Sequence, residues 1–168
     1  KYHGLNTRNS GEASYLHPII TAHILLKYTQ DQDIIVAALL HDIVEHTSIS
    51  LLQLELAFNT TVRNLVEKVT HLDMGSTLKR IRLSDKEVIQ KLLQVEDDRV
   101  VDIKLAERLH NLRTIDGHKS LQKRKKIADE TLRFFVPIAY YRGHTDMIEE
   151  LQIRCAALLG KKASEVSV

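Results

Sequence analysis

The chain has 168 residues, a length that fits one domain. Hydrophobic residues make up 43% and charged residues 27%, which is the balance of a folded globular protein and excludes disorder over most of the chain. The formal net charge of +2 is too close to zero to indicate a nucleic-acid or membrane surface, so we expect neither as a partner.

The cysteine and hydropathy patterns bear on the compartment. Cys155 is the single cysteine and cannot form a disulfide within the chain, which fits a reducing compartment and predicts a cytoplasmic location. The apolar run over residues 34–40 is far shorter than the ~18 residues of a membrane span, and the N-terminal residues lack a signal pattern. The chain begins at Lys1 rather than at a methionine, which leaves open that it is part of a longer protein.

Glycine and proline are scarce, and apolar residues recur every three or four positions, so the sequence predicts an all-α fold. The first helix is expected over residues 15–28, where Pro18 falls in a first turn that tolerates proline. Asp31 and Asp33 are expected to cap a second helix over residues 34–46. The first half of this helix is apolar nearly all round, which is typical of a central helix packed on several sides.

Further helix starts are marked by residues that cap backbone amides. Ser50 with Gln53 and Ser84 with Glu87 both match the capping box. Apolar spacing predicts the remaining helices, over residues 60–72, 98–113, 119–141 with an interruption at Pro137, and 145–159.

One segment, residues 73–83, has the composition of a mobile loop. The sequence shows no internal repeat and no low-complexity stretch. We therefore expect a single helical bundle domain over residues 1–168.

The polar end of the second predicted helix carries four ionisable residues directly after the apolar run. His41 and Glu45 are four residues apart, as are Asp42 and His46, so a continuous helix would join them in one polar patch. A solvated helix end is the plain alternative. The apolar run that precedes these residues favours a functional site, because ionisable groups rarely lie at the end of a buried helix without a partner.

A second polar group lies on the predicted helix over residues 98–113, where Glu107, His110 and Asn111 share one face. An exposed charged stripe is the alternative for this segment alone. This face and the His41 and Asp42 doublet are together expected to form the two halves of a metal site.

His17 precedes Pro18 at the start of the first helix, from which its imidazole could complete the coordination. A capping or core histidine is the alternative for this residue alone. Two histidines and two carboxylates are nitrogen and oxygen donors that suit Mn²⁺, Fe²⁺, Mg²⁺ or Zn²⁺. Such a metal can lower the pKa of a bound water and neutralise charge on a phosphoryl oxygen, with Glu45 placed to orient or deprotonate the nucleophile. The sequence offers no credible nucleophilic triad and no glycine-rich phosphate loop, so it favours phosphate-ester hydrolysis.

The order of these motifs resembles the hydrolase domain of the Rel/Spo family of alarmone enzymes, within the HD phosphohydrolase superfamily. The matching stretches run through nearly the whole chain, at residues 8–12, 17–18, 37–47, 69–72, 98–114, 128–132 and 137–139. The resemblance implies a helical, Mn²⁺-dependent enzyme that removes the 3′-pyrophosphate of guanosine tetra- or pentaphosphate and gives GDP or GTP.

The resemblance also implies roles for individual residues. The implied metal ligands are His17, His41, Asp42 and Glu107. The implied pair that assists water attack is Glu45 and His46. The implied nucleotide-binding residues are Arg8, Ser10, Asn111 and Thr114.

Three places depart from the family pattern. Glu107 stands where the family has aspartate, His46 replaces the aspartate of the Glu-Asp pair, and Ala13 with Ser14 stands where the family usually has Pro-Tyr. These departures keep two alternatives open: an HD phosphohydrolase for another nucleotide, and a non-catalytic module that binds a nucleotide or a partner protein. No sequence after residue 159 resembles the family's synthetase or regulatory domains, so we expect hydrolysis without synthesis.

Overall fold

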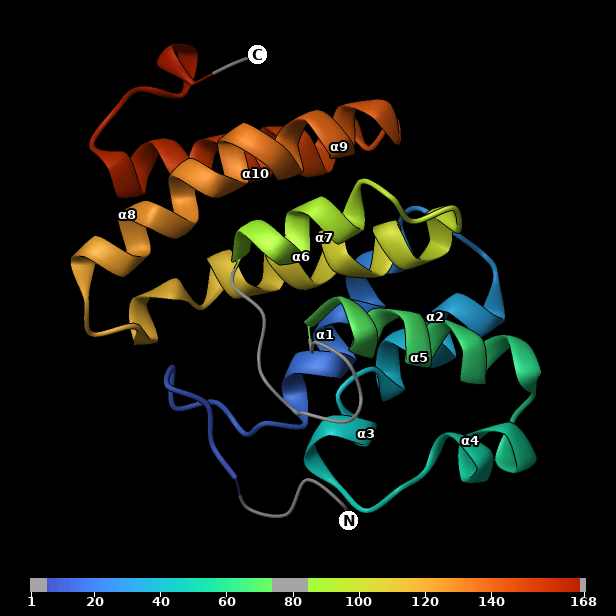
Figure 1. Ribbon diagram of the computed structural model, residues 1–168. Helices are drawn as coiled ribbons and strands as arrows, with labels where there is room; N and C mark the ends of the chain where they lie inside the picture. The colour runs from blue at the N-terminus through green and yellow to red at the C-terminus, as the bar shows by residue number, and fades with distance from the viewer. Residues whose placement is uncertain (1–5, 74–84, 167–168) are drawn as a thin grey trace. The chain divides into compact units, whose positions relative to one another are not determined.

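The computed structural model describes residues 6–73 and 85–166 (Figure 1). Over these residues the chain is helical, with one isolated antiparallel β-bridge between Thr7 and Ala13 and no strand. The predicted all-α fold is therefore confirmed. Among the described helices, none is both long enough and apolar enough to cross a membrane.

The described residues form two compact units, and each is described by itself. The first comprises residues 15–104, and the second comprises residues 6–14 together with residues 105–166. Helix α7 (Asp98–Arg113) begins in the first unit and ends in the second, and its bounds are those predicted from the apolar spacing. The expectation of one domain over residues 1–168 stays a prediction.

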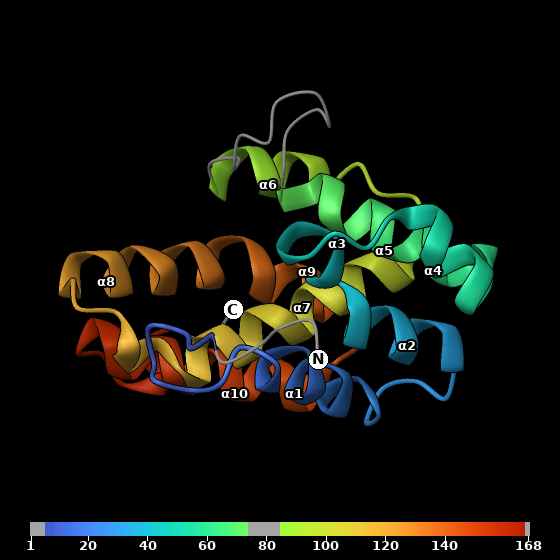
Figure 2. The same cartoon turned by 90° about the horizontal axis from the view of Figure 1, so that it is seen from below.

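The first unit is built around α2. Its helices before α7 are α1 (Leu16–Leu25), α2 (Gln32–Leu40), α3 (Ile43–His46), α4 (Leu51–Ala57), α5 (Thr60–Asp73) and α6 (Asp85–Leu92). Helix α2 packs against both α1 and α5, and α5 also packs against α4 and α6 (Figures 1 and 2). The fully buried side chains of α2 and α5 are Ile34, Ala37, Ala38, Val62, Leu65, Val66 and Val69. Burial of each larger one contributes about 1.5–3 kcal/mol.

Two of the predicted helix caps can be compared with the structure. The Asp31 carboxylate accepts the Asp33 amide at 2.9 Å and caps α2, while Asp33 itself lies in the first turn. Ser50 and Gln53 form both bonds of the predicted capping box at α4. Ser84 of the second predicted box and residues 74–83 of the predicted loop lie outside the described residues.

Two predicted helices of the first unit are too long. Helix α1 ends at Leu25 rather than at residue 28, because the Tyr28 amide bonds back to the Leu25 carbonyl three residues earlier and tightens the turn. The single helix predicted over residues 34–46 is wrong, since α2 ends at Leu40 and α3 starts at Ile43.

The break between α2 and α3 has a local cause. The His41 imidazole bonds through Nδ1 to the Ala38 carbonyl oxygen, 2.7 Å away, at the point where the helical hydrogen bonds of α2 stop. A side chain that occupies a helix carbonyl competes with continuation of the helix. His41 and Asp42 therefore lie in the break, and Glu45 and His46 lie on α3 beyond it.

The second unit packs around α10 (Thr145–Leu159), whose predicted bounds are confirmed. Helices α8 (Leu121–Glu130) and α9 (Val136–Tyr141) both pack against it (Figure 1). A 3₁₀ turn over Ile115–Gly117 follows α7.

The long helix predicted over residues 119–141 is interrupted earlier than expected. A π-helical stretch over Thr131–Phe135 joins α8 to α9, and Pro137 lies in the first turn of α9, where its missing amide is tolerated. The Thr131 hydroxyl donates to the Ile127 carbonyl oxygen at 2.7 Å within this stretch. The interruption predicted at Pro137 is thus realised in the residues before the proline.

Candidate metal centre and nucleotide-binding residues

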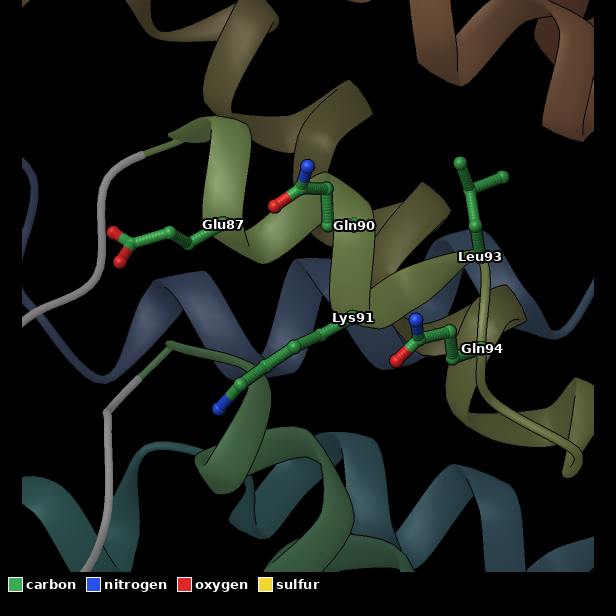
Figure 3. A pocket seen from close by; sticks show the side chains of 5 residues that line it. All are labelled: Glu87, Gln90, Lys91, Leu93 and Gln94. Carbon is green, nitrogen blue, oxygen red and sulfur yellow. The ribbon is translucent and has the colours of Figure 1, made fainter.

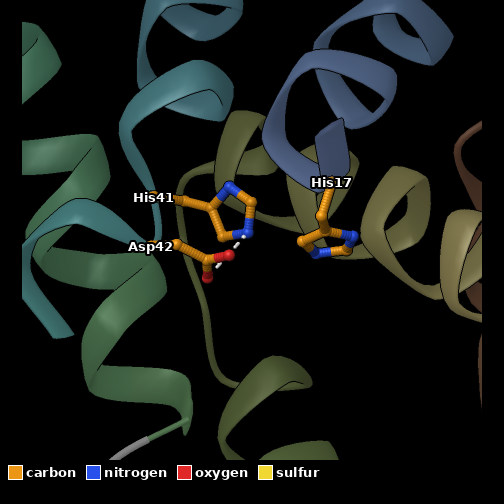
Figure 4. Close-up of side chains that lie close together, drawn as sticks. All are labelled: His17, His41 and Asp42. Carbon is orange, nitrogen blue, oxygen red and sulfur yellow. Dashed lines mark ion pairs between the residues drawn. The ribbon is translucent and has the colours of Figure 1, made fainter. Parts of the chain in front are cut away.

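Three side chains of the first unit converge on one point. His17 comes from the first turn of α1, and His41 and Asp42 come from the break after α2 (Figure 4). One donor atom from each lies within 4.8 Å of the others. His17 and His41 are buried, with 5% and 2% of their surface exposed, whereas the Asp42 side chain is 23% exposed. The cluster is therefore a nearly enclosed set of nitrogen and oxygen donors with one accessible side.

The helical hairpin of α1 and α2 explains why these residues meet. The two helices pack together and are joined by a short connection, so the start of α1 and the end of α2 lie at the same end of the pair. His41 is the residue that ends α2. The partial negative charge at a helix C-terminus favours a cation at this position.

The hydrogen bond of His41 fixes which nitrogen is available as a ligand. A carbonyl oxygen only accepts, so Nδ1 carries the proton in the bond to Ala38, and in the neutral imidazole Nε2 is the nitrogen left to bind a metal. This Nε2 atom lies 3.1 Å from Oδ1 of Asp42 (Figure 4). Two ligands about 2.1 Å from one ion and at right angles to each other are about 3 Å apart. The spacing and the carbonyl bond both fit a metal-ligating histidine.

The charges around Asp42 favour its ionised form. Burial raises the pKa of Asp42, but the combined effect of His41, His17 and His46 is larger and holds the pKa below its ordinary value. The His17 and His41 rings meet edge to face, with centroids 5.3 Å apart. An ionised carboxylate beside two imidazoles is a donor set that suits a divalent metal.

The predicted water-activating pair lies on α3, in the same unit as the three donors. Glu45 is half-buried, and His46 is exposed. His46 is close enough to Asp42 to lower its pKa. The structure therefore places His46 near Asp42, and the catalytic roles of Glu45 and His46 stay a prediction.

The other predicted site residues belong to the second unit. The Arg8 guanidinium donates through Nη2 to Oδ1 of Asn111 at 2.6 Å. Asn111 in turn donates through Nδ2 to Oε1 of Glu107 at 3.4 Å. The Thr114 hydroxyl donates to the His110 carbonyl oxygen at 3.1 Å. Arg8, Asn111 and Glu107 thus form a connected polar chain, and the assignment of Glu107 as the fourth ligand stays a prediction.

Two further residues lie beside the predicted nucleotide-binding residues: Glu12, which received no role from the sequence, and His110, which the sequence placed only on the Glu107 face. Glu12 accepts the Ser10 hydroxyl on Oε2 at 3.1 Å, and its Oε1 lies 3.8 Å from Nε2 of the buried His110. Burial lowers the pKa of His110, and the charge of Arg8 lowers it further. The sequence did contain hints of both residues, because Glu12 lies in the stretch over residues 8–12 that resembles the family, and His110 lies on the same predicted helix face as Glu107.

A surface hollow lies elsewhere, on α6 and the turn after it (Figure 3). The lining side chains are Glu87, Gln90, Lys91, Leu93 and Gln94, and they spread outward from the helix. Lys91 donates to the His71 carbonyl oxygen at 2.9 Å. This hollow includes none of the predicted site residues, so it lends them no support.

The helical fold agrees with comparisons to known proteins. A model of the HD domain matches residues 1–144, and the chain belongs to this family. The Rel/Spo resemblance is confirmed by its relatives. The bifunctional (p)ppGpp synthase/hydrolase SpoT of Escherichia coli K12 is 37% identical over 157 residues, which cover 89% of this chain and 21% of the relative.

Two further relatives give the same result. A GTP pyrophosphokinase rsh of Brucella abortus (strain 2308) is 38% identical over 151 residues, with 89% of this chain and 20% of the relative covered. A probable guanosine-3′,5′-bis(diphosphate) 3′-pyrophosphohydrolase of Synechocystis is 39% identical over 144 residues, with 84% and 19% covered. The chain thus spans about a fifth of the length of these relatives.

Proposed function

We propose that this chain is a metal-dependent 3′-pyrophosphohydrolase of guanosine tetra- and pentaphosphate. The observation that carries the proposal is the enclosed His17, His41 and Asp42 cluster in an HD domain. Two of the relatives are named for synthesis or hydrolysis of (p)ppGpp or for the 3′-pyrophosphohydrolase reaction itself. The reaction adds water across the ester linkage at the 3′ position, releases one pyrophosphate, and leaves GDP or GTP.

We assign Mn²⁺ as the metal, ahead of Mg²⁺, Fe²⁺ or Zn²⁺, on the Rel/Spo resemblance and the mixed donor set. His17, His41 and Asp42 would hold it, with Glu107 as the fourth ligand. When bound, the metal supplies positive charge that stabilises phosphoryl oxygens and activates a water molecule. The bond from His41 to Ala38 keeps the imidazole in the tautomer and orientation that a ligand needs.

The residues of α3 act on the attacking water. The Glu45 carboxylate accepts a proton from the water or holds it in line with the phosphorus atom, as a general base does. His46 stands where the family has an aspartate, and it supplies a nitrogen in place of a carboxylate oxygen as the hydrogen-bond partner.

Nucleotide binding is assigned to Arg8, Ser10, Asn111 and Thr114. The Arg8 guanidinium has five N–H donors, and the bond to Asn111 orients the fork while it uses one of them. Such a planar fork recognises a phosphate or the acceptor edge of a guanine. The partner is therefore a small nucleotide, and we place the reaction in the cytoplasm.

The test is incubation of the purified chain with guanosine tetraphosphate and Mn²⁺, with products separated by ion exchange. His41→Ala serves as the inactive variant. His23→Ala is the matched control, because His23 is an exposed histidine on α1 outside the donor cluster. GDP and pyrophosphate from the wild type and His23→Ala, but not from His41→Ala, are expected. Metal-loaded wild type that forms no product would refute the proposal, and a panel of other nucleotides would then identify a different substrate.

A further inference from the structure

The nucleotide-binding residues Arg8 and Ser10 are carried by a short hairpin over residues 6–14. Its two sides are joined by the Thr7 and Ala13 bridge and by amide bonds of 2.8 Å from Arg8 to the Glu12 carbonyl oxygen and from Ser14 to Asn6. The hairpin is well defined in itself. The positions of Arg8 and Ser10 therefore depend on where the hairpin is seated in the second unit.

Gly117 forms part of that seat. It ends the 3₁₀ turn after α7, and a Cβ atom added there would lie closer than 3.0 Å to the backbone of Ser10 and Asn9. These are backbone atoms, so no side-chain rotation can relieve the overlap. The positive-φ glycines of the described chain are Gly11, Gly143 and Gly160, so Gly117 is needed for the close approach and not for its own backbone angles.

One hydrogen bond and one longer electrostatic contact join the hairpin to α7. Arg8 donates to Asn111 at 2.6 Å, in the last full turn of the helix. Glu12 bridges the hairpin and the helix, because one carboxylate oxygen accepts the Ser10 hydroxyl and the other lies 3.8 Å from Nε2 of His110. His110 is buried, so this contact lies against the helix rather than in solvent.

We infer that Gly117 is a positioning residue for nucleotide binding, because its lack of a side chain seats the hairpin that carries Arg8 and Ser10. Glu12 is the second positioning residue, since it ties Ser10 to α7. This inference rests on the proposed function. Neither residue needs to touch the nucleotide, because both act through the hairpin.

The test is Gly117→Ala in the full chain, read by amide hydrogen exchange and by steady-state kinetics. One methyl group displaces the hairpin, so exchange of the amides within residues 6–14 should accelerate about tenfold or more. The KM for guanosine tetraphosphate should rise about fivefold or more, with kcat within about twofold of the wild type. Lys119→Ala is the matched control, because Lys119 is an exposed residue two positions after Gly117 and its truncation adds no atom against the hairpin. It should leave both readouts unchanged.

A second pair of variants covers the case in which Gly117→Ala fails to fold. Glu12→Ala removes both carboxylate contacts without adding bulk, and it should shift exchange and KM in the same direction. Glu12→Gln retains an acceptor oxygen for the Ser10 hydroxyl, so it should recover most of the wild-type KM. A merely structural loss of stability would instead lower the fraction of active enzyme and leave KM unchanged.

Two results would overturn the inference: wild-type exchange of residues 6–14 in folded Gly117→Ala and Glu12→Ala, or faster exchange with an unchanged KM. Failure of the proposed function has a different signature, namely a wild-type chain that does not cleave guanosine tetraphosphate. In that case the role in nucleotide binding falls with the function, while the exchange data still decide whether Gly117 seats the hairpin.

Discussion

The Nε2 atom of His41 lies 3.1 Å from Oδ1 of Asp42, so two consecutive residues direct their donor atoms to the same point. His17, from the start of a different helix, completes the cluster. The other ring nitrogen of His41, Nδ1, is held in place by its hydrogen bond to the Ala38 carbonyl oxygen. If these residues are the metal ligands that we propose, they are already held in position to bind a cation.

Replacement of Asp42 tests the cluster without a change in side-chain size. Asp42→Asn removes the negative charge and should reduce both bound Mn²⁺ and turnover about 100-fold or more. Metal content per chain is measured after desalting, together with pyrophosphate release. Asp129→Asn, an exposed carboxylate on α8, should behave as wild type. Full Mn²⁺ occupancy in Asp42→Asn would remove this residue from the ligand set.

The assignment of Glu107 as a ligand is tested by truncating its side chain to alanine and by shortening it to aspartate. Glu107→Ala should weaken Mn²⁺ binding and lower turnover about tenfold or more, because one carboxylate is lost. Glu107→Asp combined with His46→Asp restores the family pattern and should match or exceed the wild-type rate. Isothermal titration with Mn²⁺ gives the affinities. Wild-type affinity in Glu107→Ala would show that the fourth ligand lies elsewhere.

The Arg8 fork is predicted to matter for binding more than for chemistry. Arg8→Lys keeps the positive charge but loses the planar donor pair that Asn111 orients, so KM for guanosine tetraphosphate should rise about tenfold. The rate at saturation should change little. Arg63→Lys on α5, which pairs with Glu67, is a control of the same chemistry. An unchanged KM in Arg8→Lys would contradict the assignment of Arg8 to the nucleotide.

Acid stability should depend on Glu150 of α10. Its carboxylate accepts from Arg113, which is the main cause of a pKa lowered from 4.5 to about 2, and also from Arg154. Because the folded pKa is depressed, this stabilisation is present above about pH 4.5 and is lost as the pH falls toward 2. Glu150→Gln should therefore lower the free energy of unfolding by about 1–2 kcal/mol at pH 7, and less at pH 3.

Urea unfolding at the two pH values measures this difference, with the exposed neighbour Glu149→Gln as the control. An equal deficit for Glu150→Gln at pH 7 and pH 3 would mean that the carboxylate charge is not the source of the stabilisation.

Cys155 offers a probe of the second unit. Burial raises the pKa of its thiol to about 12, so almost none of it is thiolate at neutral pH. The native chain should therefore react with a thiol reagent only through opening of the unit, and it should react at once in denaturant. The rate of labelling is measured from the absorbance of the thiolate that an aromatic disulfide reagent releases. Rapid, complete labelling of the native protein would contradict the burial of Cys155.

Much of the fold was predictable because apolar spacing is a local property of the sequence. The bounds of α7 and α10 agree with the prediction, and the Ser50 and Gln53 cap is present. The break at His41 was not predictable, because it depends on a bond between a side chain and a carbonyl that hydropathy does not report. The interruption predicted at Pro137 was placed too late, because hydropathy does not report the π-helical stretch over Thr131–Phe135.

The site was predictable to a different extent in each unit. His17, His41 and Asp42 were predicted together and do converge, since a helical hairpin brings their positions to one end. The contact between Arg8 and Asn111 joins residues more than a hundred positions apart, and no periodicity encodes it. Gly117 carried no sequence signal, because the need for glycine arises only from the backbone of the hairpin that lies against it.

Removal of the 3′-pyrophosphate is followed by ³¹P NMR of guanosine tetraphosphate that has been incubated with the Mn²⁺-loaded chain and then freed of the paramagnetic Mn²⁺ with a chelating resin. We expect the resonances of the 3′-diphosphate to be replaced by free pyrophosphate in equal amount, and the 5′-diphosphate to remain as GDP. An unchanged spectrum, or loss of the 5′-diphosphate with the 3′-diphosphate intact, would contradict the proposed reaction.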